Sequence, residues 1–162
     1  MGLRVYWEVC GLRGLKRSEN WYEDTPDPVR KSADGRYEVW WDQKVSTPTA
    51  FKDNRPDLVL IDHADKKWVF VDFAVPFDRN VESKEDEKVA KYQDLAAEVC
   101  RMNSVKVEVV PIVVGALGIV SKNLIGWLKM IGVGDVVGAL QTSAIIGTSA
   151  ILRKVLATEP GR

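Results

Sequence analysis

Two short apolar segments near the middle of the chain, residues 58–61 and 68–75, constrain the possible folds most strongly. A six-residue connection rich in charged residues, 62–67, separates them and has the length of a hairpin loop. Segments that are apolar nearly throughout are typical of strands buried on both faces. The sequence therefore predicts a β-hairpin at the centre of a sheet that is covered on both sides.

The rest of the chain predicts an α/β fold. Residues 36–41 and 105–114 are rich in β-prone residues and predict two further strands, whereas residues 19–35 are rich in turn formers and predict a loop. Helical periodicity predicts the remaining elements, which are helices over residues 3–17, 79–102, 122–130 and 136–156. We expect a central β-sheet flanked by helices, with a helical C-terminal segment.

The composition excludes several classes of protein. The chain has 162 residues, of which 46% are hydrophobic and 28% charged, which excludes disordered, collagen-like and coiled-coil chains. Its 23 Lys and Arg residues balance 23 Asp and Glu residues, whereas a free-standing DNA-binding domain generally carries a basic excess. Cys10 and Cys100 form no disulfide framework, so a reducing, intracellular compartment is expected. We expect neither a membrane span nor a signal peptide, because the apolar runs are short or interrupted.

Two aspartates mark one end of the predicted hairpin. Asp57 directly precedes the first strand and Asp72 lies inside the second, with 14 residues between them. In an antiparallel hairpin both side chains reach the same end of the sheet. An unpaired buried carboxylate is costly, so Asp72 needs a compensating group, for which a divalent cation is one candidate. The alternative is structural, with Asp57 capping a turn and Asp72 forming a salt bridge.

One lysine lies on the apolar face of the helix predicted over residues 79–102. At about 100° per residue, one narrow stripe contains Val81, Lys88, Tyr92, Leu95 and Val99. Lysine is rarely buried, yet Lys88 is expected to point toward the sheet and its carboxylates. Carboxylates that hold Mg²⁺, together with a lysine that stabilises charge on phosphate oxygens, fit phosphodiester hydrolysis. Alternatively, Lys88 extends along the sheet edge to solvent.

Three sequence blocks carry a family resemblance. Residues 54–59 (NRPDLV), 71–76 (VDFAVP) and 87–92 (EKVAKY) resemble the restriction-like endonuclease domain at the C-terminus of non-LTR retrotransposon reverse transcriptase polyproteins, a member of the PD-(D/E)XK nuclease superfamily. Further blocks in order extend the resemblance over about residues 20–157, at 20–22 with Pro26, 41–42 with Thr47, 110–118, 147–148 and 151–156. The resemblance implies a restriction-endonuclease-like core with a mixed sheet in residues 36–162. Residues 1–35 would form an N-terminal helix and loop leading into it, the whole being one compact domain.

The resemblance also implies a metal site. Asp57 and Asp72 would be the metal ligands, assisted by the main-chain carbonyl of Phe73, with Mg²⁺ as the cofactor and Mn²⁺ as a substitute. Asp42 would be either an additional acidic ligand or a structural residue; the sequence leaves both readings open.

The catalytic lysine is where the sequence departs from the superfamily pattern. The position after Asp72 that usually carries this lysine is occupied by Ala74. In the retrotransposon branch the lysine is thought to come from the following helix, which implies Lys88 as the catalytic residue. Lys91 is the alternative donor, and Tyr92 is expected to orient the substrate or a water molecule.

The function implied by the resemblance is Mg²⁺-dependent nicking of target DNA for retrotransposon integration. Its partners would be DNA and a reverse transcriptase domain or the element's RNA, and it would act in the nucleus on chromosomal DNA. One alternative is an inactive or domesticated remnant that binds nucleic acid or protein, which the zero net charge favours. Another is a structure-specific nuclease resembling a junction resolvase, in which the apolar segment 133–156 would form a homodimer interface.

Overall fold

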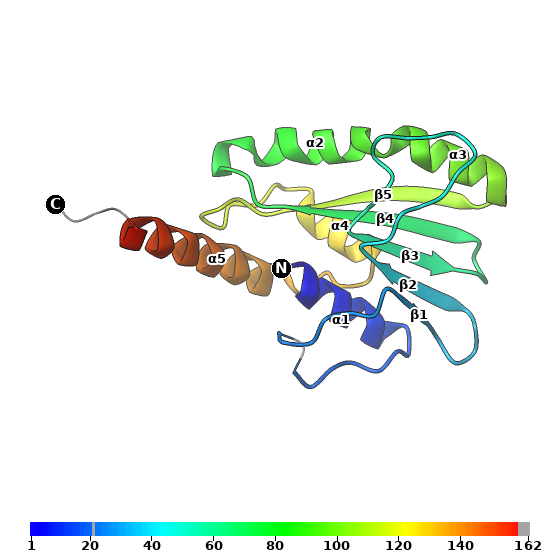
Figure 1. Ribbon diagram of the computed structural model, residues 1–162, viewed down its shortest axis with the longest axis horizontal. Coiled ribbons are helices and arrows are strands. Elements are labelled where there is room, and N and C mark those ends of the chain that lie inside the picture. The colour runs from blue at the N-terminus through cyan, green and yellow to red at the C-terminus, as the bar shows by residue number, and fades with distance from the viewer. Residues whose placement is uncertain (21, 159–162) are drawn as a thin grey trace.

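A central sheet of five strands organises the computed structural model, which describes residues 1–20 and 22–158 (Figure 1). In their order across the sheet, the strands are β1 (Val29–Lys31), β2 (Tyr37–Trp41), β3 (Leu58–Asp62), β4 (Lys67–Ala74) and β5 (Lys106–Val113). Neighbours from β1 to β4 are antiparallel, whereas β4 and β5 are parallel. The expected α/β class with a mixed sheet and a helical C-terminal segment is therefore confirmed. Trp21 and residues 159–162, which fall within the predicted blocks and domain, lie outside the described residues.

Helices cover both faces of the sheet. They are α1 (Gly2–Leu12), the short 3₁₀ helix η1 (Asp78–Asn80), α2 (Val81–Lys91), α3 (Gln93–Asn103), α4 (Leu124–Met130) and α5 (Val137–Thr158). The helices α2 and α3 form the crossover that a parallel pair such as β4 and β5 requires. They lie along one side of the sheet, here called the α2 face, at the top of Figure 1. On the opposite side, the α1 face, pack α1, α4 and the first part of α5.

Two predicted elements near the N-terminus differ from the structure. The helix predicted over residues 3–17 ends at Leu12, because the chain turns at Gly14, which has φ of 71°. The prediction that residues 19–35 form only a loop is wrong, since they contain β1. This strand is three residues long and mostly exposed, and its pairing with β2 forms it. Neither its length nor its polarity gives a strand signal in the sequence.

The single helix predicted over residues 79–102 is also wrong, because it is interrupted. The chain forms η1, α2 and α3, and the backbone leaves helical geometry at Tyr92, with φ of −108° and ψ of 6°. No glycine or proline marks this position in the sequence. The interruption coincides with a buried tyrosine whose hydroxyl contacts the chain next to the predicted carboxylates.

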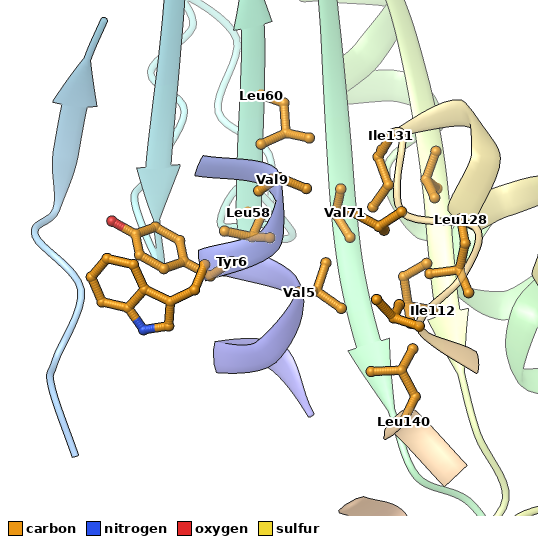
Figure 2. Close-up of a cluster of buried hydrophobic side chains, with 14 of the residues drawn as sticks. Val5, Tyr6, Val9, Leu58, Leu60, Val71, Ile112, Leu128, Ile131 and Leu140 are labelled. Atoms are coloured by element: carbon orange, nitrogen blue, oxygen red, sulfur yellow. The ribbon is translucent and has the colours of Figure 1, made fainter. Parts of the chain in front are cut away.

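The larger hydrophobic core fills the α1 face (Figure 2). Val5 and Val9 of α1 lie against Leu58 of β3, while Leu128 of α4 lies near Ile112 of β5. All five side chains are fully buried. Burial of such a side chain stabilises a fold by about 1.5–3 kcal/mol, so this face supplies most of the apolar stabilisation of the sheet.

A smaller core lies on the α2 face. There Val59 of β3 and Phe70 of β4 pack against Leu95 and Val99 of α3. Because side chains alternate along a strand, the central strands β3 and β4 are buried on both faces. The predicted hairpin at the centre of the sheet is therefore confirmed, with Leu58 paired with Val71.

The C-terminal helix is covered over only its first half. Leu140 and Ala144 of α5 are buried, whereas Ile151, Leu152 and Leu156 are between 55% and 69% exposed. Figure 1 shows the second half of α5 extending away from the sheet. None of the helices in residues 1–20 and 22–158 combines the length and the apolar character needed to span a membrane.

The two outer strands of the sheet are both irregular. The first, β1, is only three residues long. The other, β5, contains the buried Pro111, which lies beside Asp72 in the parallel register with β4. Proline has no main-chain N–H and is found in sheets chiefly on such outer strands.

Candidate active site

The hairpin register brings the two predicted carboxylates together. Pairing of Leu58 with Val71 places Asp57 opposite Asp72 on the α2 face, since it continues the antiparallel register by one residue. Asp57 Oδ2 accepts a hydrogen bond of 2.7 Å from the main-chain N–H of Phe73. Asp57 is half-buried and the Asp72 side chain is 4% exposed. The two acids therefore share one end of the sheet, in a largely desolvated position.

Two lysines of α2 neutralise Asp72. Lys88 Nζ lies 2.7 Å from Asp72 Oδ2, and Lys91 Nζ lies 3.6 Å from the same oxygen. Lys88 is the more buried of the two, with 15% of its side chain exposed against 29% for Lys91. Asp72 Oδ2 is itself buried and accepts no hydrogen bond of regular geometry. The structure thus places both candidate lysines at the carboxylates, with Lys88 in closer contact.

Tyr92 closes the site from the α2–α3 junction. Its hydroxyl lies 3.2 Å from the main-chain oxygen of Arg55 and 3.4 Å from Asp72 Oδ1, and can donate to either. Its ring packs edge-on against Phe70, and Lys91 Nζ lies 4.8 Å from the ring centroid. Burial, together with the charges of the two carboxylates, raises the pKa of the Tyr92 hydroxyl, which therefore remains a hydrogen-bond donor near neutral pH.

The electrostatics of the pair are unfavourable for Asp57. Burial raises the pKa of Asp57 to about 6, and the neighbouring Asp72 carboxylate adds to the increase. The hydrogen bond from the Phe73 N–H and the charge of Lys88 act in the opposite direction on this pKa, without overcoming burial. A further cation between the carboxylates would therefore stabilise the ionised form of Asp57.

Asp42 lies next to this site but has a different partner. Its main-chain N–H donates to the main-chain oxygen of Asp57 at 2.9 Å, while its exposed carboxylate forms an ion pair with Arg55, with Oδ1 2.8 Å from Nε. Among the described residues, no group of three or more acidic, histidine or cysteine side chains is close enough to share a metal ion. The structure therefore groups Asp42 with Arg55 rather than with Asp57 and Asp72.

The donor atoms at the carboxylate pair suit a hard divalent cation. Two carboxylates and the nearby main-chain carbonyl of Phe73 are all oxygen donors, the class that Mg²⁺ and Mn²⁺ prefer. Mg²⁺ is commonly held by only one or two carboxylates, with water and substrate phosphate completing its shell. The irregularly bonded Asp72 Oδ2 and the raised pKa of Asp57 are both consistent with a cation here.

A buried hydrogen bond between Glu85 and Ser121, beside the site, was not predicted from the sequence. Glu85 lies on α2 one turn before Lys88, is 3% exposed, and accepts a hydrogen bond of 2.6 Å from Ser121 Oγ. Its spacing from Lys88 indicates that it faces the sheet. Ser121 lies in the loop after β5, where no sequence pattern indicates its partner. The pair ties α2, and with it Lys88, to the loop after β5, which lies at the same end of the sheet as the carboxylates.

Comparison with known proteins gives no family: no protein-family model matches the chain, and no curated protein sequence matches it. The structure defines a class of protein, a mixed α/β protein with a carboxylate–lysine cluster at one end of a central hairpin.

Proposed function

We propose that the protein is a Mg²⁺-dependent endonuclease that hydrolyses phosphodiester bonds in DNA. The observation that carries this proposal is the cluster of Asp57, Asp72 and Lys88, in which Lys88 Nζ lies 2.7 Å from Asp72 Oδ2 in a desolvated position. A structural ion pair needs one carboxylate and one lysine. The second carboxylate, Asp57, is costly to ionise in this buried position beside Asp72. A catalytic role explains its presence better than a role in stabilising the fold.

Each residue has a defined role in this proposal. Asp57, Asp72 and the Phe73 carbonyl would hold Mg²⁺, which when bound polarises the phosphate and lowers the pKa of a water molecule. The Lys88 ammonium stabilises negative charge that develops on the phosphate oxygens. The Tyr92 hydroxyl, 3.4 Å from Asp72 Oδ1, would donate a hydrogen bond to that carboxylate and orient it.

Lys91 has a different role from Lys88. It is more exposed and lies farther from Asp72, at 3.6 Å. Its ammonium is therefore suited to contacting the DNA backbone beside the scissile phosphate. This division leaves Lys88 as the catalytic lysine and Lys91 as a binding residue.

The finer assignment is a restriction-endonuclease-like core from a retrotransposon protein. The order of a β-hairpin, a helical crossover and a parallel strand supports this core, as do the sequence blocks around Asp57, Asp72 and Lys88. In that setting the protein would nick target DNA in the nucleus for integration. A reverse transcriptase domain or the element's RNA would be its partner.

A plasmid-nicking assay tests the proposal. Wild type, Asp72→Asn and Asp86→Asn are compared on supercoiled DNA with Mg²⁺ and with Mn²⁺. Asp86 is an exposed acid on the same helix as Lys88 and serves as the matched control. We expect Asp72→Asn to lose at least about a hundredfold in rate and Asp86→Asn to retain activity. Absence of nicking by folded wild type, or equal nicking by both variants, would contradict the proposal.

A second candidate is a binding module that does not cut. One observation favours it: Lys88 neutralises Asp72 by direct contact, in a chain of zero net charge. Such a module would bind DNA or protein equally well with and without Mg²⁺. Titration calorimetry with Mg²⁺ separates the two candidates, since only the nuclease requires binding that Asp57→Asn abolishes.

A further inference from the structure

A cavity of about 580 Å³ opens where β4 leads into α2. Phe77 lines it from the connecting segment and Asn80 from η1, while Ser83, Lys84 and Glu87 line it from α2. The cavity thus combines an aromatic ring with amide, hydroxyl and charged groups. No role in holding Mg²⁺ or in phosphodiester hydrolysis has been assigned to any of these side chains above.

Phe77 is exposed on a backbone that is held firmly in place. Its side chain is 74% exposed. Its main-chain oxygen accepts a hydrogen bond of 2.9 Å from Asn80, and the preceding Pro76 oxygen accepts one of 2.8 Å from Ala116. Asp78, which follows, accepts a hydrogen bond of 2.9 Å from the N–H of Leu117. A large aromatic ring displayed in water by a rigid segment is typical of a recognition surface.

The cavity lies close to the carboxylates. Lys84 precedes Lys88 by four residues on α2, which is about 6 Å along the helix axis. Val75, which also lines the cavity, follows Asp72 by three residues, or about 10 Å along an extended chain. Successive nucleotides of a DNA strand are about 3.4 Å apart along the duplex axis. At this spacing, about 6–10 Å corresponds to two or three nucleotides, so a phosphate at the carboxylates places a nucleotide two or three positions along the same strand at the cavity.

The groups in the cavity match the parts of a nucleotide. An aromatic ring stacks on any base, since every base has a π-face. Asn80 supplies an amide for a base edge, and the Ser83 hydroxyl, which donates to the main-chain oxygen of Asn80 at 3.0 Å, can accept a hydrogen bond from one. The Lys84 ammonium, which also lines the cavity, bonds both Glu87 oxygens at 2.9 and 2.8 Å and has a further N–H to offer a phosphate. A paired base offers no free face to Phe77, so only an unstacked base fits this arrangement.

We propose that this cavity binds an unpaired DNA nucleotide two or three positions from the scissile phosphate, with its base stacked on Phe77. The proposal rests on the proposed nuclease function for its substrate. It adds that the protein prefers DNA with an unpaired base two or three nucleotides from the cut over an intact duplex.

Binding measurements without cleavage test this inference. Two DNA duplexes of the same sequence are compared, one fully paired and one with a single bulged 2-aminopurine. Both are titrated with the Asp72→Asn protein carrying Phe77, Phe77→Ala or Phe77→Trp. Stacking on Phe77 quenches the 2-aminopurine fluorescence. Leu12→Ala is the matched control, since Leu12 is 59% exposed on the opposite side of the sheet.

We expect Phe77→Ala to weaken binding of the bulged DNA by about tenfold and to remove the quenching. Phe77→Trp should preserve both, and Leu12→Ala should change neither. Equal affinities of Phe77 and Phe77→Ala proteins for bulged DNA, or equal losses on both duplexes, would overturn the inference, as would undetectable binding of either DNA. If the protein nicks DNA but Phe77 has no effect on binding, the nuclease proposal stands and the cavity proposal fails. If Phe77 quenches the fluorescence but the protein does not nick DNA, the cavity still binds a nucleotide and the nuclease proposal fails.

Discussion

Two neighbouring residues of β4 show how differently the faces of this sheet are built. Phe73 packs against the hydrophobic core of the α1 face, whereas Asp72 lies on the α2 face between two lysines and a second carboxylate. The α1 face is sealed by apolar contacts. The α2 face brings charges of both signs into a desolvated position, where burial raises the pKa of Asp57. The difference indicates that the α1 face stabilises the fold, while the end of the α2 face carries a cost in stability, which the proposed nuclease chemistry would explain.

The largest effect on stability is expected on the α1 face. Leu58 is fully buried there, one residue after Asp57. We expect Leu58→Ala to lower the free energy of unfolding by about 3–5 kcal/mol through lost burial and a residual cavity. Urea denaturation followed by circular dichroism measures this change. A loss below about 1 kcal/mol would contradict the conclusion that the α1 face supplies most of the stability.

The next effect concerns activity on the α2 face. Lys88→Met and Lys91→Met remove one charge each and keep most of the side-chain stem. We expect Lys88→Met to lower the nicking rate by about 10²–10³-fold and Lys91→Met to lower it by less than about tenfold, because Lys88 is the closer and more buried partner of Asp72. Single-turnover nicking rates separate them. The reverse order would transfer the catalytic role to Lys91.

A smaller effect is expected in the pH dependence of stability. The pKa of Asp57 is about 6 in the folded protein, above its ordinary value of 3.8. Between these values Asp57 binds more protons in the folded state than in the unfolded state, so the contribution of Asp57 to stability falls as the pH rises from about 4 to 6. After allowance for partial exposure, we expect a fall of about 1 kcal/mol.

The Asp57→Asn variant isolates this effect. It should lack the fall and be more stable than wild type at pH 7, while the two proteins have similar stability at pH 4. Urea denaturation at both pH values provides the measurement. Parallel pH profiles of stability for wild type and variant would show that ionisation of Asp57 does not destabilise the folded protein.

The smallest effect on stability is expected at the exposed end of α5. Leu156 is 69% exposed, so Leu156→Lys should change the free energy of unfolding by less than about 0.5 kcal/mol. Its effect on assembly is larger if the predicted homodimer forms through this helix. Sedimentation then gives wild type at twice the chain mass of 18.1 kDa and the variant at the chain mass. A monomeric wild type would exclude the dimer and leave the comparison of the faces intact.

The central hairpin and the approach of Asp57 to Asp72 could be predicted because both depend on local patterns. Alternating side chains and a short connection fix the register of two adjacent strands. The inward direction of Lys88 follows from helical periodicity in the same way. These signals need only the residues that are close together in the sequence.

Features that depend on distant contacts could not be predicted. The three residues of β1 form a strand only because β2 pairs with them. The helix is interrupted at Tyr92 without a glycine or proline, beside contacts to residues far earlier in the chain. The bond between Glu85 and Ser121 joins residues separated by a complete helix and strand. Long-range packing, rather than local propensity, determines these details.

The irregular outer strands limit how copies of this protein can associate. A free strand edge presents a row of main-chain donors and acceptors that can recruit a strand from another molecule, which leads to aggregation. Here β1 offers only three residues, and β5 cannot donate a main-chain hydrogen bond at Pro111. The sheet is therefore poorly suited to growth by strand addition. Association between copies is left to the helices, above all to the uncovered half of α5.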